Sequence, residues 1–339
     1  MIRRLVLLLF VLLVAAGAGA WWMYHRLVTP FQGYAGDEVF VEFPAGTSVS
    51  AMAEALAEAG VVRDALTFRV AARMSGQERR LQAGEYRFAG PASSFEVVDK
   101  LARGEVYLRP ITFREGLTIR EMAAHFETMG FGTADAFLEA ASRGALVQDL
   151  DPDAGNLEGY LFPSTYTLSR STTAEQLVET MVSTFRAAFT PALRAEAEAA
   201  GLSVREVVTL ASVVERETGH PEERPMVAAV FLNRLRIGMP LQTDPTVIYA
   251  MMLTGRWDGN IRRSDLQMDH PYNTYRNPGL PPGPIAAPGL ASIEAVLRPA
   301  DVPYLYFVSR NDGTHVFAQT LAEHNRNVLE WQIRRRQAR

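Results

Sequence analysis

The feature that most constrains this chain is an uncharged apolar run close to its start. The run extends from Leu5 to Tyr24 and follows Arg3 and Arg4. A helix rises about 1.5 Å per residue, so roughly twenty residues span the ~30 Å hydrocarbon core of a bilayer. Arginines before the run favour a cytoplasmic N-terminus. We therefore expect residues 1–25 to form a cytoplasmic tip and one transmembrane anchor, with the rest of the chain outside the cytoplasm.

A cleaved signal peptide is the alternative for the same segment. Ala18, Gly19 and Ala20 have the small side chains of a cleavage site. The apolar run nevertheless continues past them into Trp21 and Trp22, and tryptophan favours the interface between membrane and water. We therefore prefer the uncleaved anchor, although either interpretation exports the chain.

The remaining sequence has the composition of folded globular domains. Of the 339 residues, 48% are hydrophobic and 21% are charged, which suffices to bury more than one core. The formal net charge of -4 argues against a nucleic-acid partner, because such binding depends on neutralising phosphates. The chain has no cysteine, which excludes disulfides, thiolate metal sites and cysteine nucleophiles.

A strand, a turn and a helix are predicted twice in the first part of the folded sequence. Each copy alternates apolar and polar residues, turns at a glycine, and then shows apolar residues at helical spacing. Phe43 corresponds to Phe113 and Gly60 to Gly130, a constant offset of 70 positions. We expect residues 39–131 to form an α/β subdomain of two related units, similar to the modules of LysM-like sugar-binding folds. A spacer without a ligand is the alternative.

The complete fold is expected to be α+β. Residues 26–38 contain Pro30 and two glycines and show no periodicity, so a linker is predicted there. Residues 132–339 are predicted to form a mainly helical domain with a small β-hairpin region. The turn of that hairpin is expected at Asn311, Asp312 and Gly313, between two short apolar runs.

A predicted helix ends in two glutamates, Glu215 and Glu217. An apolar stripe along this helix comprises Val207, Leu210, Val213 and Val214. Glu217 is the next position on the stripe, where burial favours a protonated carboxyl group that can act as a general acid. Glu215 lies about 200° around the helix and is expected to act through packing or a salt bridge, for example to Arg216 or Arg234. The alternative is that both glutamates are solvated on the last turn.

Amide, carboxyl and hydroxyl side chains set among aromatic residues follow this helix. They can hydrogen-bond sugar hydroxyl and acetamido groups, and the candidate substrate-binding residues are Gln242, Asp244, Asn273, Thr274 and Tyr275. Asp244 and Asn273 can also serve as caps of a helix or loop. Glu158 heads an aromatic loop and is a sixth candidate, although such aromatic clusters often pack in a core.

Other chemistries lack their sequence signatures. No H-E-x-x-H or G-x-S-x-G motif and no phosphate-binding loop occurs. We therefore expect neither a metal ion nor a cofactor.

Four stretches together resemble the endolytic murein transglycosylases of the YceG-like family. They are LASVVERETG, FLNRLRIGMPLQTDPTVIYAM, YNTYRNPGLPPGPIAAPG and YLYFVSR. The resemblance implies a single-pass protein of the cell inner membrane with a LysM-like subdomain and a periplasmic catalytic domain. It implies cleavage of MurNAc–GlcNAc bonds in nascent peptidoglycan glycan strands, with 1,6-anhydro-MurNAc ends that terminate elongation. Peptidoglycan synthases are candidate partners, and the catalytic glutamate is the one followed by threonine, Glu217.

Two other functions stay open at this point. A lysozyme-like muramidase would add a second carboxylate, from Asp244 or Asp269, because hydrolytic glycosidases use a pair. A membrane-anchored scaffold that binds glycan would need no catalytic residue. The mass of the product ends separates the first alternative from a transglycosylase, and an activity assay separates the second.

Overall fold

The computed structural model describes residues 2–334. The chain divides into two compact units. Unit 1 comprises Met1–Pro110 with Thr167–Ser171, and unit 2 comprises Ile111–Tyr166 with Thr172–Arg339. Helices dominate both units, and the sheets of the described residues are two-stranded, which agrees with the expected α+β class.

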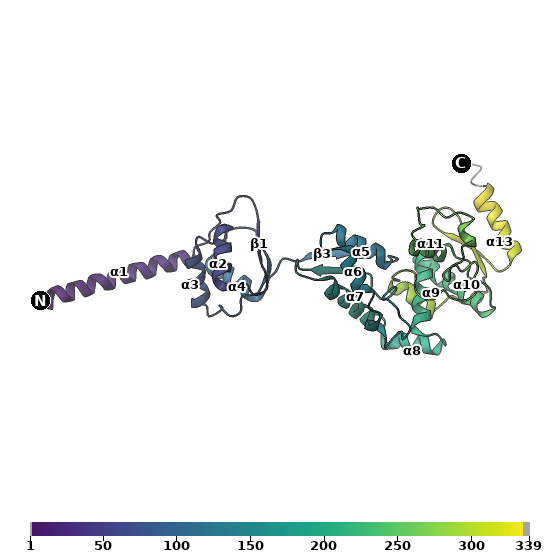
Figure 1. Cartoon of the computed structure of the whole chain (residues 1–339), viewed down its shortest axis with the longest axis horizontal. Coiled ribbons are helices and arrows are strands. Elements are labelled where there is room, and N and C mark those ends of the chain that lie inside the picture. The colour runs from purple at the N-terminus through teal and green to yellow at the C-terminus, as the bar shows by residue number, and fades with distance from the viewer. Residues whose placement is uncertain (1, 335–339) are drawn as a thin grey trace. The chain divides into compact units, whose positions relative to one another are not determined.

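Unit 1 is a small α/β structure at the end of one long helix (Figure 1). Its elements are α1 (Ile2–Val28), β1 (Val39–Phe43), α2 (Val49–Glu58), α3 (Ala65–Met74), β2 (Gly84–Phe88) and α4 (Ser94–Arg103). Strands β1 and β2 pair antiparallel, with Val41 opposite Tyr86. The core lies between this ribbon and the helices and includes Phe43, Phe68 and Leu101. The apolar spacing of the sequence therefore produces the expected strands and helices.

Helix α1 is long and apolar enough to cross a membrane, by length and composition. Its final turn belongs to unit 1, because Leu27 is fully buried in the core and Arg26 pairs with Asp64. The backbone of Phe31 then pairs with that of Ala92. The segment 26–38 is thus part of unit 1 rather than the free linker expected from its glycines and proline. Long-range packing, which periodicity does not reveal, is the reason for the difference.

Unit 2 is built around a central helix, α9 (Figure 1). Its first elements are β3 (Arg109–Thr112), which begins at the boundary, α5 (Ile119–Thr128), α6 (Ala134–Ala141), η1 (Gly144–Val147), β4 (Thr165–Leu168) and α7 (Ala174–Ala188). The central part comprises α8 (Pro191–Ala199), α9 (Val204–Glu217), η2 (Pro221–Glu223), α10 (Arg224–Arg236), α11 (Asp244–Leu253), η3 (Asp265–Gln267) and α12 (Leu290–Leu297). Helices α8, α10, α11 and α12 all pack on α9, which is why its apolar residues are buried.

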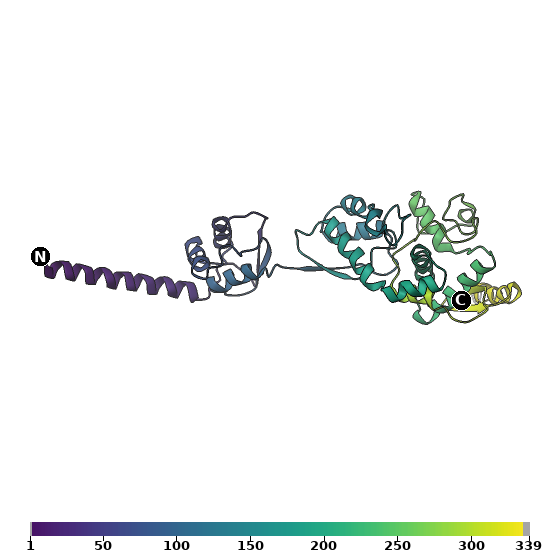
Figure 2. The same ribbon diagram turned by 90° about the horizontal axis from the view of Figure 1, so that it is seen from below.

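The chain ends in the expected hairpin and a helix. Strands β5 (Tyr306–Ser309) and β6 (His315–Ala318) pair antiparallel, with Ser309 opposite His315. Asn311 and Gly313 have positive φ angles, as a tight hairpin connection requires. Helix α13 (Leu321–Val328) packs on both strands and continues into a π-helical turn, η4 (Leu329–Arg334), seen in yellow in Figure 2.

The order of elements in the first part of the chain repeats over a longer stretch than the predicted duplication. The order β1-α2-α3-β2-α4 recurs as β3-α5-α6-β4-α7, with η1 inserted before β4. Tyr86 in β2 and Tyr166 in β4 are both buried, and each hydroxyl donates to a carbonyl four residues earlier, that of Gln82 at 2.9 Å and that of Phe162 at 2.6 Å. The two copies belong to different units. The chain therefore divides at Pro110, and residues 39–131 do not form one body.

Candidate active site

Glu217 is the last residue of α9. The helix ends there because Thr218 adopts an extended conformation, with φ -135° and ψ 134°. The Glu217 side chain is partly buried, and its Oε2 accepts a hydrogen bond of 2.6 Å from the hydroxyl of Thr243. The stripe of buried valines and leucine that precedes Glu217 thus ends in a carboxyl group held by a single hydroxyl donor.

The surroundings of Glu217 favour its protonated form. Burial raises the pKa of Glu217 above its usual value, and the negative charge of Asp244 raises it further. The hydroxyl of Thr243 and the charges of His315 and Arg234 act in the opposite direction. A carboxyl group with a raised pKa can donate a proton near neutral pH and, once ionised, can take one back. This is the property expected of Glu217 from its place on the apolar stripe.

Thr274 holds the segment that carries Thr243. The backbone N–H of Thr243 donates to the Thr274 hydroxyl at 3.2 Å, and the N–H of Gln242 donates to the Thr274 carbonyl at 3.2 Å. Gln242 has a φ of 47°, which is uncommon for a residue with a side chain and costs of order 1–3 kcal/mol. Thr274 itself is buried. Thr274 therefore positions Thr243, the donor to Glu217, without contacting Glu217 through a hydrogen bond of its own.

Three of the predicted substrate-binding residues reach the surface beside this carboxyl group. Gln242 and Asp244 are exposed, and Tyr275 is partly exposed. The Tyr275 hydroxyl donates to Oδ1 of Asp244 at 2.7 Å. Burial and this bond to Asp244 raise the pKa of Tyr275, so its hydroxyl stays neutral. An acceptor, a hydroxyl and an amide are thereby available to a polar ligand near Glu217.

Asn273 occupies a different position from the other candidates. Its side chain is fully buried, and its amide donates to the carbonyls of Leu266 at 3.1 Å and Met268 at 2.7 Å. Its Oδ1 accepts from the backbone N–H of Tyr275 at 3.0 Å. These bonds occupy the amide, so Asn273 in this structure orders the loop that carries Tyr275.

Two basic side chains on the Glu217 side, Arg234 and His315, were not assigned to Glu217 from the sequence. Arg234 in α10 is buried, and its guanidinium donates to the carbonyls of Leu305 at 2.6 Å and Leu241 at 2.5 Å. Arg234 was a suggested partner of Glu215, but its charge acts on Glu217 instead. No local pattern predicts that Arg234 acts on Glu217, because Arg234 lies on a different helix, α10.

The second group, His315 of β6, is tied to the end of α9 through Glu223. The Glu223 carboxylate accepts from the His315 backbone N–H and lies 2.7 Å from His315 Nδ1. It also accepts from the Thr218 hydroxyl at 3.1 Å. Burial opposes ionisation of Glu223, but the hydrogen bonds from His315 hold its pKa below the usual range. The residue directly after Glu217 is therefore fixed to the hairpin.

Glu215 points away from Glu217, as the helix geometry predicts. Its carboxylate pairs with Arg224 at 3.0 Å and accepts from the Gly289 N–H at 3.0 Å and the Ser292 hydroxyl at 2.7 Å. The Glu215 side chain is 6% exposed and that of Arg224 is 10% exposed. The suggested partners Arg216 and Arg234 are wrong, because η2 returns the chain so that Arg224 faces this side of α9.

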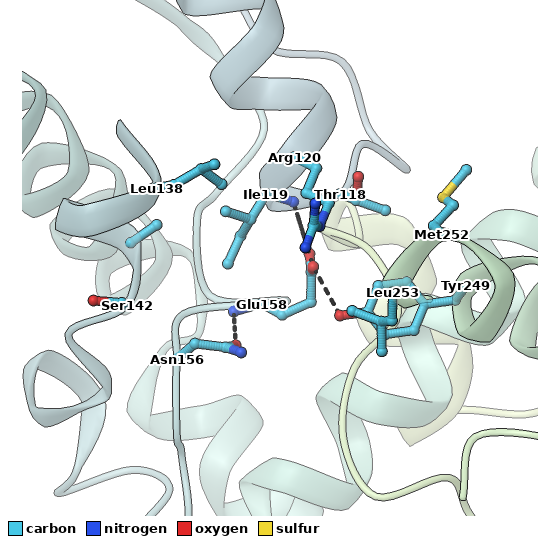
Figure 3. Close-up of a pocket in the computed structure, with 11 residues that line it drawn as sticks. Thr118, Ile119, Arg120, Leu138, Ser142, Asn156, Glu158, Tyr249, Met252 and Leu253 are labelled. Carbon is cyan, nitrogen blue, oxygen red and sulfur yellow. Dashed lines mark hydrogen bonds between the residues drawn. The ribbon is translucent and has the colours of Figure 1, made fainter. Parts of the chain in front are cut away.

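Glu158 lies in a second cluster, with different partners from those of Glu217. Its carboxylate accepts from the Ile119 N–H at the start of α5, at 3.1 Å, and from the Tyr249 hydroxyl in α11, at 3.0 Å (Figure 3). The next residue, Gly159, has a φ of 85°, and a Cβ there would lie 2.5 Å from Cβ of Pro284. Only glycine fits this turn, which directs Glu158 inward. Burial raises the pKa of Glu158 to about 7.

This pKa predicts a pH dependence of stability that glutamine at position 158 removes. An unfolded chain loses the Glu158 proton near the ordinary glutamate pKa of 4.5, whereas the folded chain keeps it until about pH 7. The contribution of the group to the free energy of unfolding is therefore complete below pH 4.5 and is lost as the pH rises through 7, roughly 3 kcal/mol in all. Between pH 5 and pH 8 the melting temperature should fall more for the wild type than for Glu158→Gln. Equal decreases in the two proteins would show that Glu158 ionises normally.

Among residues 2–334, no group of three or more His, Asp or Glu side chains is arranged to hold a metal ion. The expectation of a metal-free reaction stays a prediction. Asp269, the other suggested second carboxylate, is exposed.

The fold and this arrangement belong to a known class of protein. The sequence profile of the YceG-like family matches residues 41–330. The chain is therefore a member of the YceG-like family.

Individual relatives agree with this assignment. The chain is 33% identical over 324 residues to the endolytic murein transglycosylase of Bacillus subtilis, covering 91% of this chain and 89% of that protein. It is 31% identical over 367 residues to the endolytic murein transglycosylase of Streptococcus pneumoniae serotype 2, covering 97% of this chain and 65% of that longer protein. The crystal structure of a YceG-like protein of Listeria monocytogenes has a TM-score of 0.59 and 32% identity, covering 86% of this chain and 98% of that one.

Proposed function

We propose that this chain is a peptidoglycan lytic transglycosylase whose single acid–base group is Glu217. The observation that carries the proposal is the Glu217 carboxyl group at the end of α9, with a raised pKa and one hydroxyl donor. Membership of the YceG-like family and the relatives named endolytic murein transglycosylase support the substrate, the glycan strands of peptidoglycan.

Glu217 acts twice in the proposed reaction. It first gives its proton to the glycosidic oxygen as the bond from that oxygen to the anomeric carbon of the muramoyl residue breaks. The Glu217 carboxylate then takes the proton from the O6 hydroxyl of the same residue as O6 forms a bond to the anomeric carbon. The product has a 1,6-anhydro end, the carboxyl group is restored, and no water enters. The charge of Arg234 stabilises the ionised form of Glu217 between the two steps.

The polar groups beside Glu217 are assigned to substrate binding in two ways. Gln242, Asp244 and Tyr275 are at least partly exposed, so we assign them to direct contacts with sugar hydroxyl and acetamido groups. Asn273 and Thr274 are buried, so they support the same contacts by holding the loop and Thr243 in place.

A hydrolytic muramidase with Asp244 as the second carboxylate is the alternative. The observations that favour this alternative are that Asp244 is exposed and that its charge acts on Glu217. Its hydrogen bond from Tyr275 also fits a role in binding. The mass of the new glycan ends separates the two reactions, because an anhydro end is one water lighter than a reducing end. Digests of polymeric peptidoglycan that contain only reducing ends would refute the transglycosylase.

We assign α1 to the inner membrane, with both units in the periplasm, because its length, its apolar sequence and the arginines at its start agree. A reporter fused to the C-terminus should then be active only outside the cytoplasm, and activity inside would refute this topology.

The strand–helix repeats support a LysM-like glycan-binding role for unit 1, with peptidoglycan synthases as candidate partners of the anchored enzyme. Loss of binding to insoluble peptidoglycan on mutation of unit 1 surface residues tests that role, and unchanged binding would favour a spacer.

A further inference from the structure

A pocket of about 190 Å³ lies in unit 2, and Glu158 is one of the residues that line it. It is formed by the start of α5, by α6, by the loop that carries Asn156 and Glu158, and by the second half of α11 (Figure 3). Its apolar wall consists of Leu138, Ala141, Met252 and Leu253. The reaction described above does not use this pocket, and the loop belongs to the segment inserted in the second repeat.

Helix α11 connects the pocket to the reacting carboxyl group. Thr243, which donates to Glu217, directly precedes the helix, and Tyr249 and Leu253 of the same helix line the pocket. At 1.5 Å per residue, these two residues lie roughly 8 and 14 Å along the helix from its first residue. A glycan strand that runs along α11 from Glu217 would therefore reach the pocket after a few sugar residues.

The polar groups of the pocket match an acetamido group. The Glu158 carboxyl group offers acceptor oxygens, and Oδ1 of Asn156 accepts from the Glu158 N–H at 2.9 Å, so the Asn156 amide nitrogen can still donate. The apolar wall can take a methyl group. An acetamido group presents one N–H, one carbonyl and one methyl group, which these three features satisfy together.

The charges of the pocket favour a neutral ligand over a cationic one. Arg120 lines the pocket, and its positive charge acts on Glu158. Below about pH 7 Glu158 keeps its proton, so an ammonium group finds no carboxylate in the pocket and meets the positive charge of Arg120. We propose that this pocket is a distal subsite for the acetamido group of a sugar residue a few units from the bond that Glu217 cleaves. The inference rests on the proposed function and gives a physical basis for cleavage within a strand.

Two substitutions test the subsite in the full-length protein in detergent. Leu253→Trp fills the pocket from a residue that is 39% exposed, so the core is kept, and Asn156→Ala removes the amide donor. The matched controls are Leu321→Trp, at a residue 56% exposed in α13, and Asn260→Ala, at an exposed loop residue. With uncrosslinked glycan strands, each pocket variant should raise KM by about fivefold to tenfold, as for the loss of one ordinary hydrogen bond, with kcat nearly unchanged. The products should also become more broadly distributed in length.

A binding measurement on Glu217→Gln separates this inference from the proposed function. The N-acetylglucosamine tetramer should bind this variant, the deacetylated glucosamine tetramer should not, and adding Leu253→Trp should weaken the binding of the acetylated tetramer. If the wild type cuts no glycan but these binding differences appear, the subsite stands and the proposed reaction fails. If KM, product lengths and tetramer binding are the same with and without the pocket substitutions, the subsite is refuted.

Discussion

Replacing Glu217 by glutamine is expected to lower turnover on peptidoglycan by at least about 10²–10⁴-fold, the usual contribution of general acid–base catalysis. Glutamine keeps the shape of the side chain and can accept the hydrogen bond from Thr243, but it cannot give or take a proton. Because burial raises the pKa of Glu217 toward the neutral form, a neutral amide should change the stability of the fold little.

The measurement is the rate of release of soluble glycan by the full-length variant, with its melting temperature as the control for folding. Thr243→Val offers a second comparison, since it removes only the hydroxyl donor to Glu217. It should lower turnover less than Glu217→Gln. An active Glu217→Gln protein would show that another group transfers the proton.

The second large effect is expected on stability, at the buried pair of Glu215 and Arg224. Arg224→Met removes the cation and leaves the Glu215 carboxylate buried, with only the Gly289 N–H and the Ser292 hydroxyl as partners. Breaking a buried ion pair in this way costs about 3–5 kcal/mol. The free energy of unfolding of Arg224→Met should fall by that amount, measured by denaturant titration.

Arg262→Met is the matched control for this substitution. Arg262 pairs with Asp258 on the surface, where both side chains are about half exposed, so its loss should leave the stability nearly unchanged. Below its melting temperature, Arg224→Met should keep most of the wild-type turnover, because Glu215 lies on the side of α9 away from Glu217. A variant that is stable but inactive would instead place the Glu215 cluster in the reaction.

Sequence reasoning predicted those parts of the site that depend on one helix or one repeat. The positions of Glu215 and Glu217 on opposite sides of α9 follow from helical geometry, and the structure confirms them. The hairpin at Asn311–Gly313 follows from its turn residues. The strand–helix duplication follows from a constant offset along the chain. Each of these can be read from the sequence without knowing which elements pack together.

The partners of these residues could not be predicted, because they come from other elements of the fold. Arg224 and Arg234 lie at the two ends of α10 and His315 lies on β6, and these two elements pack around the end of α9 only in the folded chain. The buried position of Asn273 also depends on folding, since its amide is occupied by backbone carbonyls of its own loop. The boundary at Pro110 could not be predicted either, because the second repeat resembles the first in sequence but packs in the other unit.

The central claim is that Glu217 transfers the proton within the sugar and that no water enters the product. Digestion of polymeric peptidoglycan in water enriched in heavy oxygen tests this claim most directly. We predict new glycan ends that are 1,6-anhydro, one water lighter than reducing ends, and free of the heavy isotope, with no such ends formed by Glu217→Gln. New reducing ends that carry the heavy isotope would contradict the claim, because they require hydrolysis.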